Sequence, residues 1–185
     1  GVEALAALGA VDFLMWVVTG ISTGLTQGFS IQLSQYYGAK DFENLRKSLA
    51  HSYRLTAFIA AGVLILSQSF ASLVLTGLHT PSNIIGMSLL YLRIIFCGIP
   101  ATAAYNMFAS ALRAMGNSKT PLTAMIIASV LNVSLDILFV AGFGWGVAGA
   151  AIATVIAQSF SAVYCFLILR RIDIVHLTRA DFMPA

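Results

Sequence analysis

Three polar residues in the second half of the chain could together hold a cation. Asp136 lies four residues after Asn132, so both side chains project from one face of a helix. The glycine-rich turn at 142–146 begins six residues after Asp136, and Thr154 follows that turn by eight residues. If antiparallel helices flank the turn, the three residues reach a similar depth. A carboxylate, an amide oxygen and a hydroxyl suit Na⁺, or H⁺ if the carboxyl group is protonated. The alternative is that Asn132 and Asp136 only hydrogen-bond a neighbouring helix.

Two further ionisable residues, Asp12 and Arg93, also lie within apolar stretches. An unpaired charge there costs several kcal/mol, so a structural ion pair between them is preferred to a role in substrate binding. Tyr91 lies near the start of its stretch, where tyrosine anchors a helix at the membrane surface.

The sequence contains none of the common catalytic motifs HExxH, GxSxG or CxxC. The segment Ser118-Lys119-Thr120 resembles the end of a phosphate-binding loop, but Arg113 and Ser118 stand where that motif needs glycine. We therefore expect neither an enzyme nor a bound cofactor, and any transport must be driven by an ion gradient.

The composition excludes an ordinary water-soluble surface. Hydrophobic residues make up 59% of the 185 residues and charged residues 9%, whereas soluble domains have about 25% charged residues. The net charge of +3 is spread over polar segments between apolar stretches, which does not favour a nucleic-acid partner. Four stretches without any charge are long enough to cross a bilayer: 13–39, 55–92, 94–112 and 137–169.

These stretches predict an all-α integral membrane protein with five helices. We expect them at about 4–37, 55–78, 84–112, 122–141 and 147–169, which together form one transmembrane unit over 1–169. Pro100 should kink the third helix. Residues 170–185 are expected to be a cytoplasmic tail or a linker to a second lobe.

The basic residues predict the orientation of these helices. Nine of the ten lie in 38–54, in 113–121 or after 169, and none lies in 79–83 or 142–146. The rule that cytoplasmic loops are rich in Lys and Arg places the first three segments in the cytoplasm of a multi-pass protein of the cell membrane. The first helix then starts outside, which leads us to expect an upstream helix in a longer protein.

Six short motifs occur along the chain in a fixed order. They are ALAALG at 4–9, QYYGA at 35–39, YLRI at 91–94 with GIP at 98–100, LRAMGNSKTP at 112–121, NVSLD at 132–136 and GVAGAAIAT at 146–154. Together they resemble the MATE (multidrug and toxic compound extrusion) family of cation-coupled multidrug exporters, over nearly the whole chain.

The resemblance implies twelve helices in two six-helix lobes, of which this chain supplies five helices of the first lobe. It implies that Asn132, Asp136 and Thr154 belong to a cation site, with the backbone carbonyl of Ala150 as a further ligand, and that Tyr91 lies near the same cavity. The implied partners are small amphipathic or cationic organic substrates, the lipid bilayer, a first helix that carries a further acid, and the C-terminal lobe.

The sequence thus predicts part of an H⁺- or Na⁺-coupled antiporter for multidrug efflux that works by alternating access. One alternative is a flippase for lipid-linked precursors from a related family, whose cavity should hold several basic residues, whereas here only Arg93 is intramembrane. Another is a membrane scaffold without transport activity, which predicts no cation-dependent behaviour at Asp136.

Overall fold

The computed structural model describes residues 2–77 and 82–172, and all regular elements in these ranges are helices. They are α1 (Val2–Gly38), α2 (Phe42–Gly77), α3 (Ser82–Cys97), α4 (Ile99–Ala114), α5 (Lys119–Asp136), the π-helix η1 (Ile137–Gly142) and α6 (Gly146–Arg170). Because α3 continues into α4 and α5 into η1, the described chain forms five helical rods. The predicted five-helix, all-α fold is confirmed.

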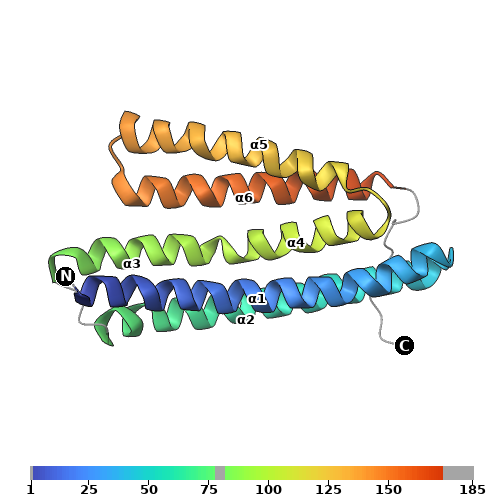
Figure 1. The fold of residues 1–185 in the computed structure, drawn as a ribbon, viewed down its shortest axis with the longest axis horizontal. Helices are drawn as coiled ribbons and strands as arrows, with labels where there is room; N and C mark the ends of the chain where they lie inside the picture. The colour runs from blue at the N-terminus through green and yellow to red at the C-terminus, as the bar shows by residue number, and fades with distance from the viewer. Residues whose placement is uncertain (1, 78–81, 173–185) are drawn as a thin grey trace.

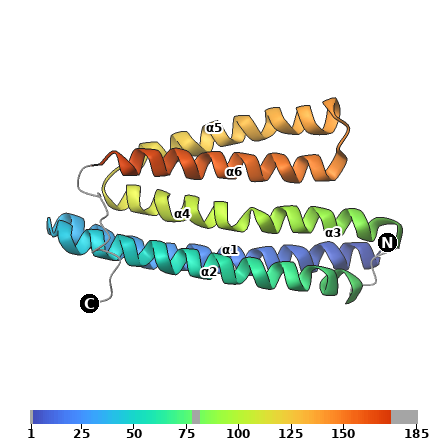
Figure 2. The ribbon, with the colours of Figure 1, turned by 180° about the vertical axis from the view of Figure 1, so that it is seen from behind.

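The five rods form three layers, which Figures 1 and 2 show from opposite sides. The α5–α6 pair lies above the α3–α4 rod, and α1 and α2 lie below it. Helix α4 contacts α1, α2 and α6 and is therefore the centre of the bundle. The largest buried cluster lies around its C-terminal half and includes Leu33, Leu45, Leu49, Met107, Leu112 and Leu169.

Helix α2 begins much earlier than the predicted membrane span at residue 55. Lys40 adopts a positive φ of 56°, and the carboxylate of Asp41 then accepts a hydrogen bond from the backbone N–H of Asn44 at 3.3 Å. This contact caps the helix that starts at Phe42. The polar residues at 43–54, expected as part of a cytoplasmic loop, thus form the first turns of a continuous helix.

The third predicted helix is divided rather than merely kinked. Gly98 separates α3 from α4, and Pro100 occupies the first turn of α4. Backbone N–H groups in the first turn of a helix have no acceptor within the helix, so the missing N–H of proline costs no hydrogen bond there. A Cβ on Gly98 would lie 3.0 Å from Cγ2 of Val155, so the break packs directly against α6.

Four helical segments of the described chain are long and apolar enough to cross a membrane: Phe42–Ser69, Leu89–Ala114, Lys119–Gly142 and Ala148–Arg170. The outward faces of the bundle present large apolar side chains such as Phe58 and Val130, as expected for contact with lipid.

The arrangement of the rods agrees with the orientation predicted from charge. The α4–α5 connection and the C-terminus of α6 lie at the same end of the bundle as the α1–α2 connection (Figure 1). The described basic residues other than Arg93 lie in these connections, at the helix ends beside them or in the N-terminal half of α2. The α5–α6 turn, which has no Lys or Arg, lies at the opposite end.

Candidate functional site

The candidate cation site lies where α5 changes from α-helical to π-helical winding. Asp136 is the last residue of α5, and η1 begins at the next residue. The wider winding is visible in the bond from the N–H of Phe143 to the carbonyl of Leu138, 2.9 Å long and spanning five residues. The helix expected at about 122–141 thus continues to Gly142, and its last six residues are π-helical. Such π-helical turns are rare and occur often at functional sites.

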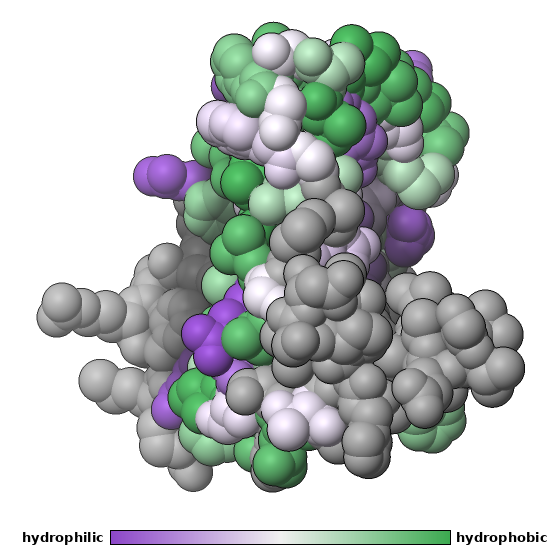
Figure 3. Space-filling view, turned by 90° about the vertical axis from the view of Figure 1, so that its left-hand side faces the viewer, coloured by the Kyte–Doolittle hydropathy of each residue, from purple (hydrophilic) through white to green (hydrophobic). Residues whose placement is uncertain are grey.

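An aromatic cluster closes the outer end of the hairpin. The rings of Phe139, Phe143 and Trp145 stack or tilt on one another with centroids 5.0 to 5.9 Å apart. Gly144 and Gly146 take φ values of +68° and +61°, which side-chain-bearing residues rarely adopt, and so make the short turn. Figure 3, a view of the molecule from this end, shows mainly hydrophobic residues in its upper part, where α5 and α6 lie.

Gly149 sets the register between the two arms of the hairpin, because it lies directly against Phe139. On α5, Asp136 lies three residues before Phe139, and Asn132 lies seven residues before it. On α6, Thr154 lies five residues after Gly149. Since α5 and α6 run antiparallel (Figure 1), Thr154 lies at a depth between those of Asn132 and Asp136. At about 1.5 Å per residue, the three residues fall within roughly 6 Å along the helix axis.

The carboxylate of Asp136 lacks a partner on one side. Its Oδ1 atom is buried and accepts no hydrogen bond, the only side-chain oxygen or nitrogen in the described residues of which this is true. A buried polar atom without a partner is unfavourable and indicates a ligand, a water molecule or a further polypeptide segment that completes the site. Asn132 is partly exposed on the same arm.

Thr154 is oriented so that its oxygen can act as a ligand. Its hydroxyl donates a hydrogen bond to the carbonyl of Ala150 at 3.0 Å. The hydroxyl proton is thereby engaged, and the lone pairs of Oγ1 remain available to accept. The Ala150 carbonyl accepts this bond in addition to the helical N–H of residue 154, so binding a cation there would need one of the two bonds to give way. The donor set of carboxylate, hydroxyl and carbonyl oxygens suits a hard cation, although the role of these residues in binding one stays a prediction.

Two of the other predicted site residues, Tyr91 and Arg93, lie on α3. Tyr91 is half-buried and precedes the Gly98 break by seven residues, which places it nearer the outer end than Asp136. The side chain of Arg93 is exposed, while its backbone carbonyl accepts a hydrogen bond from Nε2 of Gln68 at 3.0 Å. The side chain of Asp12 lies outside the described part, so the predicted Asp12–Arg93 ion pair stays a prediction.

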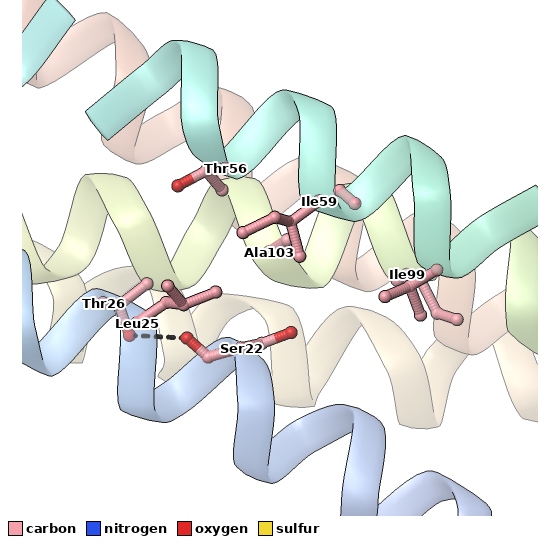
Figure 4. A pocket seen from close by; sticks show the side chains of 9 residues that line it. Ser22, Leu25, Thr26, Thr56, Ile59, Ile99 and Ala103 are labelled. Atoms are coloured by element: carbon pink, nitrogen blue, oxygen red, sulfur yellow. Dashed lines mark hydrogen bonds between the residues drawn. The ribbon is translucent and has the colours of Figure 1, made fainter. Parts of the chain in front are cut away.

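Two cavities lie away from this hairpin. A small one of about 10 Å³, the size of a single water molecule, is lined by the hydroxyls of Ser22, Thr26 and Thr56 among apolar residues (Figure 4). The Thr26 hydroxyl is already bonded to the carbonyls of Ser22 and Thr23. A larger groove of about 430 Å³ lies between α2, α4 and α6 and is almost wholly apolar, with Tyr53 and Thr56 at its edge. Neither cavity offers a charged group.

The sequence did not reveal the π-helical segment or the close contact at Gly149. Glycines on both sides of the turn were the only available signal, and glycine spacing does not distinguish α-helical from π-helical winding. Across the described residues, no three His, Cys, Asp or Glu side chains gather as a metal site would require. A cation at Asp136 would therefore rest on one carboxylate and neutral oxygens.

The chain matches proteins whose names indicate drug export. A family model described as MatE matches residues 1–138. The probable multidrug resistance protein YoeA of Bacillus subtilis (strain 168) is 32% identical over 173 residues, which cover 91% of this chain and 36% of that protein. The probable multidrug resistance protein YpnP of the same organism is 32% identical over 164 residues, which cover 89% of this chain and 37% of that protein. The chain thus spans just over a third of the length of these relatives.

Solved structures show the same fold. The chain superposes with a TM-score of 0.86 on a structure titled as the outward-facing conformation of a multidrug resistance MATE family transporter of the MOP superfamily. It superposes with a TM-score of 0.87 on one titled as the inward-facing conformation. In both cases the identity is 26%, and the match covers 100% of this chain and 42% of the solved chain. Taken with its membrane-spanning helices, the polypeptide is a multi-pass protein of the cell membrane and belongs to the MatE family of transporters.

Proposed function

We propose that this chain is part of the first lobe of a cation-coupled multidrug efflux antiporter. The coupling ion is H⁺ or Na⁺, and the exported compounds are small, amphipathic and often cationic organic molecules. The observation that carries the proposal is the buried carboxylate oxygen of Asp136, which has no protein partner. The family relationship and the drug-resistance names of the relatives support the substrate class.

The chemistry of the hairpin supports a cation rather than an anion. The acidic group at this depth is Asp136, with Asn132 one turn away on the same arm and Thr154 on the other. A negative charge held in low dielectric favours any neutralising ion, whether a proton on the carboxylate or a sodium ion between the oxygens. Binding or release of that ion would change the net charge at Asp136 and so the free energy of packing α5 against α6.

Alternating access follows as the mode of coupling. The two solved transporters described above are titled as outward-facing and inward-facing, and this chain resembles both with nearly the same TM-score. This supports a lobe that keeps its internal fold while the transporter changes between the two states. Ion occupancy at Asp136 would then bias which state is stable.

The proposal is tested with the purified transporter that contains this chain, reconstituted into liposomes preloaded with the organic cation ethidium. An inward Na⁺ or H⁺ gradient is imposed, and ethidium movement is followed by its fluorescence. We expect export to start with one of the two gradients and to cease when that gradient is collapsed. Ethidium movement that is equally fast with and without either gradient would contradict cation coupling.

The two alternative functions lack a comparable observation. A flippase would need several basic residues for a pyrophosphate headgroup, and within the described spans Arg93 is the basic residue that lies away from the cytoplasmic ends. A scaffold without transport activity would leave the unpaired oxygen of Asp136 without a purpose.

A further inference from the structure

Gly149 of α6 lies tightly against the π-helical segment. A Cβ atom placed there would lie 3.0 Å from Cβ of Phe139, 3.0 Å from Cβ of Trp145 and 3.2 Å from the backbone carbonyl carbon of Phe139. Carbon atoms that are not bonded to one another make good contact at about 3.5 to 4.0 Å. No side chain larger than hydrogen fits at this position unless the neighbouring segment moves.

The contact at Gly149 differs from those of other helical glycines. Gly24, Gly28 and Gly62 have nothing within 4 Å of an added Cβ. At Gly98 an added Cβ would lie 3.0 Å from a terminal methyl carbon of Val155 and 3.1 Å from the carbonyl oxygen of Ile95, one turn earlier on the same rod. At Gly149 the neighbours are backbone or Cβ atoms, which no side-chain rotation can remove. An added methyl group would therefore push the neighbouring backbone at Phe139 away by a few tenths of an ångström.

The segment that would be displaced directly follows the candidate ligand Asp136, since η1 begins at residue 137. On the other arm, Gly149 directly precedes Ala150, whose carbonyl is bonded to the Thr154 hydroxyl at 3.0 Å. The packing at Gly149 thus fixes the distance between the carboxylate on α5 and the oxygens on α6. Functional sites need their groups held to about 0.5 Å.

We propose that Gly149 is a positioning residue for cation binding at Asp136. It contacts no ion itself, and it acts by letting η1 lie against α6 so that the carboxylate and the oxygens of α6 face a common point. This inference rests on the proposed cation coupling and adds a determinant of cation affinity that lies outside the ligand set.

The test compares Gly149→Ala with Gly62→Ala in the transporter that contains this chain. Gly62 is a matched control because it is also helical and an added Cβ there meets nothing within 4 Å. The measured quantities are the cation concentration that gives half-maximal export, the maximal export rate, and the amount of monodisperse protein in the membrane. We expect Gly149→Ala to raise the half-saturating cation concentration about tenfold, because the ligands are shifted from their positions around the ion. The maximal export rate and the amount of monodisperse protein should stay within about twofold of wild type. Gly62→Ala should leave all three unchanged.

A second variant approaches the same contact from the other arm. Phe139→Ala keeps the Cβ but removes the ring that stacks on Trp145 at 5.0 Å, which should loosen η1 and raise the half-saturating concentration to a smaller extent. An unchanged half-saturating concentration in Gly149→Ala, or an equal rise in Gly62→Ala, would overturn the assignment. If Gly149→Ala does not accumulate, an unchanged value in Phe139→Ala overturns it. Wild-type export without any cation dependence would instead overturn the proposed function, and this inference with it.

Discussion

At the scale of single residues, the candidate site combines a carboxylate oxygen without a hydrogen-bond partner with a hydroxyl group whose proton is already donated. The Oδ1 atom of Asp136 has no hydrogen-bond partner, and Thr154 directs its proton to the Ala150 carbonyl. This arrangement is suited to accepting a cation, because the carboxylate of Asp136 and the hydroxyl oxygen of Thr154 both present lone pairs and the hydroxyl proton is already engaged.

Removing the neutral oxygens should weaken the site without abolishing it. We expect Asn132→Ala and Thr154→Ala each to raise the half-saturating cation concentration about two- to tenfold, since a neutral hydrogen-bonding partner contributes about 0.5–1.5 kcal/mol. Thr154→Ser is the matched control, because it keeps the hydroxyl and should behave like wild type. Equal values for Thr154→Ala and Thr154→Ser would remove this hydroxyl from the ligand set.

The depth of these residues could be predicted from the sequence, but their local geometry could not. The four-residue spacing of Asn132 and Asp136 and the glycine turn are sufficient to place them near Thr154. The unpaired state of one carboxylate oxygen depends on the rotation of α5 against α6. That rotation is set by the contact at Gly149, which no periodicity encodes.

At the scale of elements, the sequence predicted the rods well and their interruptions less well. Charge-free stretches mark membrane helices, and Pro100 correctly marked a distortion of the third one. Gly98, not the proline, ends α3. The second membrane span was predicted to start at residue 55, whereas α2 starts at Phe42, because the polar residues before 55 suggested a loop. A run of polar residues indicates contact with water but not the backbone conformation. The exposed first turns of a helix are as polar as a loop, so the two cannot be distinguished by polarity.

The α3–α4 break should depend on the absence of a side chain at residue 98. In Gly98→Ala the new Cβ would lie 3.0 Å from Cγ2 of Val155 and 3.1 Å from the carbonyl oxygen of Ile95. Overpacking of this kind costs about 1–3 kcal/mol, so we expect a lower melting temperature of the purified protein in detergent. Val155→Ala removes the obstructing methyl groups and should restore part of the loss in the double variant. A double variant no more stable than Gly98→Ala would show that the Val155 contact is not the cause.

At the scale of the whole molecule, the described bundle has a basic end and an end without basic loop residues, which supports the orientation predicted from charge. Lys119, at the start of α5, and Phe143, in the outer turn, are both exposed and lie at opposite ends of one rod. Both positions can therefore report on topology.

The predicted orientation can be tested by cysteine labelling of intact cells. Both native cysteines, Cys97 and Cys165, are first replaced, and Phe143→Cys and Lys119→Cys are then introduced separately. We expect a membrane-impermeant maleimide added outside to label position 143 at once and position 119 only after the membrane is permeabilised. The reverse pattern would invert the topology.

The 185-residue chain by itself should not export drugs. It spans 36% of the length of YoeA and 42% of the solved transporter chains, and alternating access requires two lobes that move against each other. Expressed alone in a drug-sensitive strain, it should give the same minimal inhibitory concentration of ethidium as an empty vector, even when immunoblotting shows it in the membrane. Resistance from this chain alone would show that a single partial lobe suffices.

The most direct test of the central claim is the export rate as a function of external cation concentration for wild type and Asp136→Asn. The substitution keeps the size and polarity of the side chain but removes its negative charge, so the protein should accumulate normally. We predict that wild-type export rises with the driving cation and saturates, whereas the variant exports at least about tenfold more slowly and has lost its cation dependence. An unchanged rate and an unchanged cation dependence in Asp136→Asn would exclude Asp136 from the coupling mechanism and leave helix packing as its role.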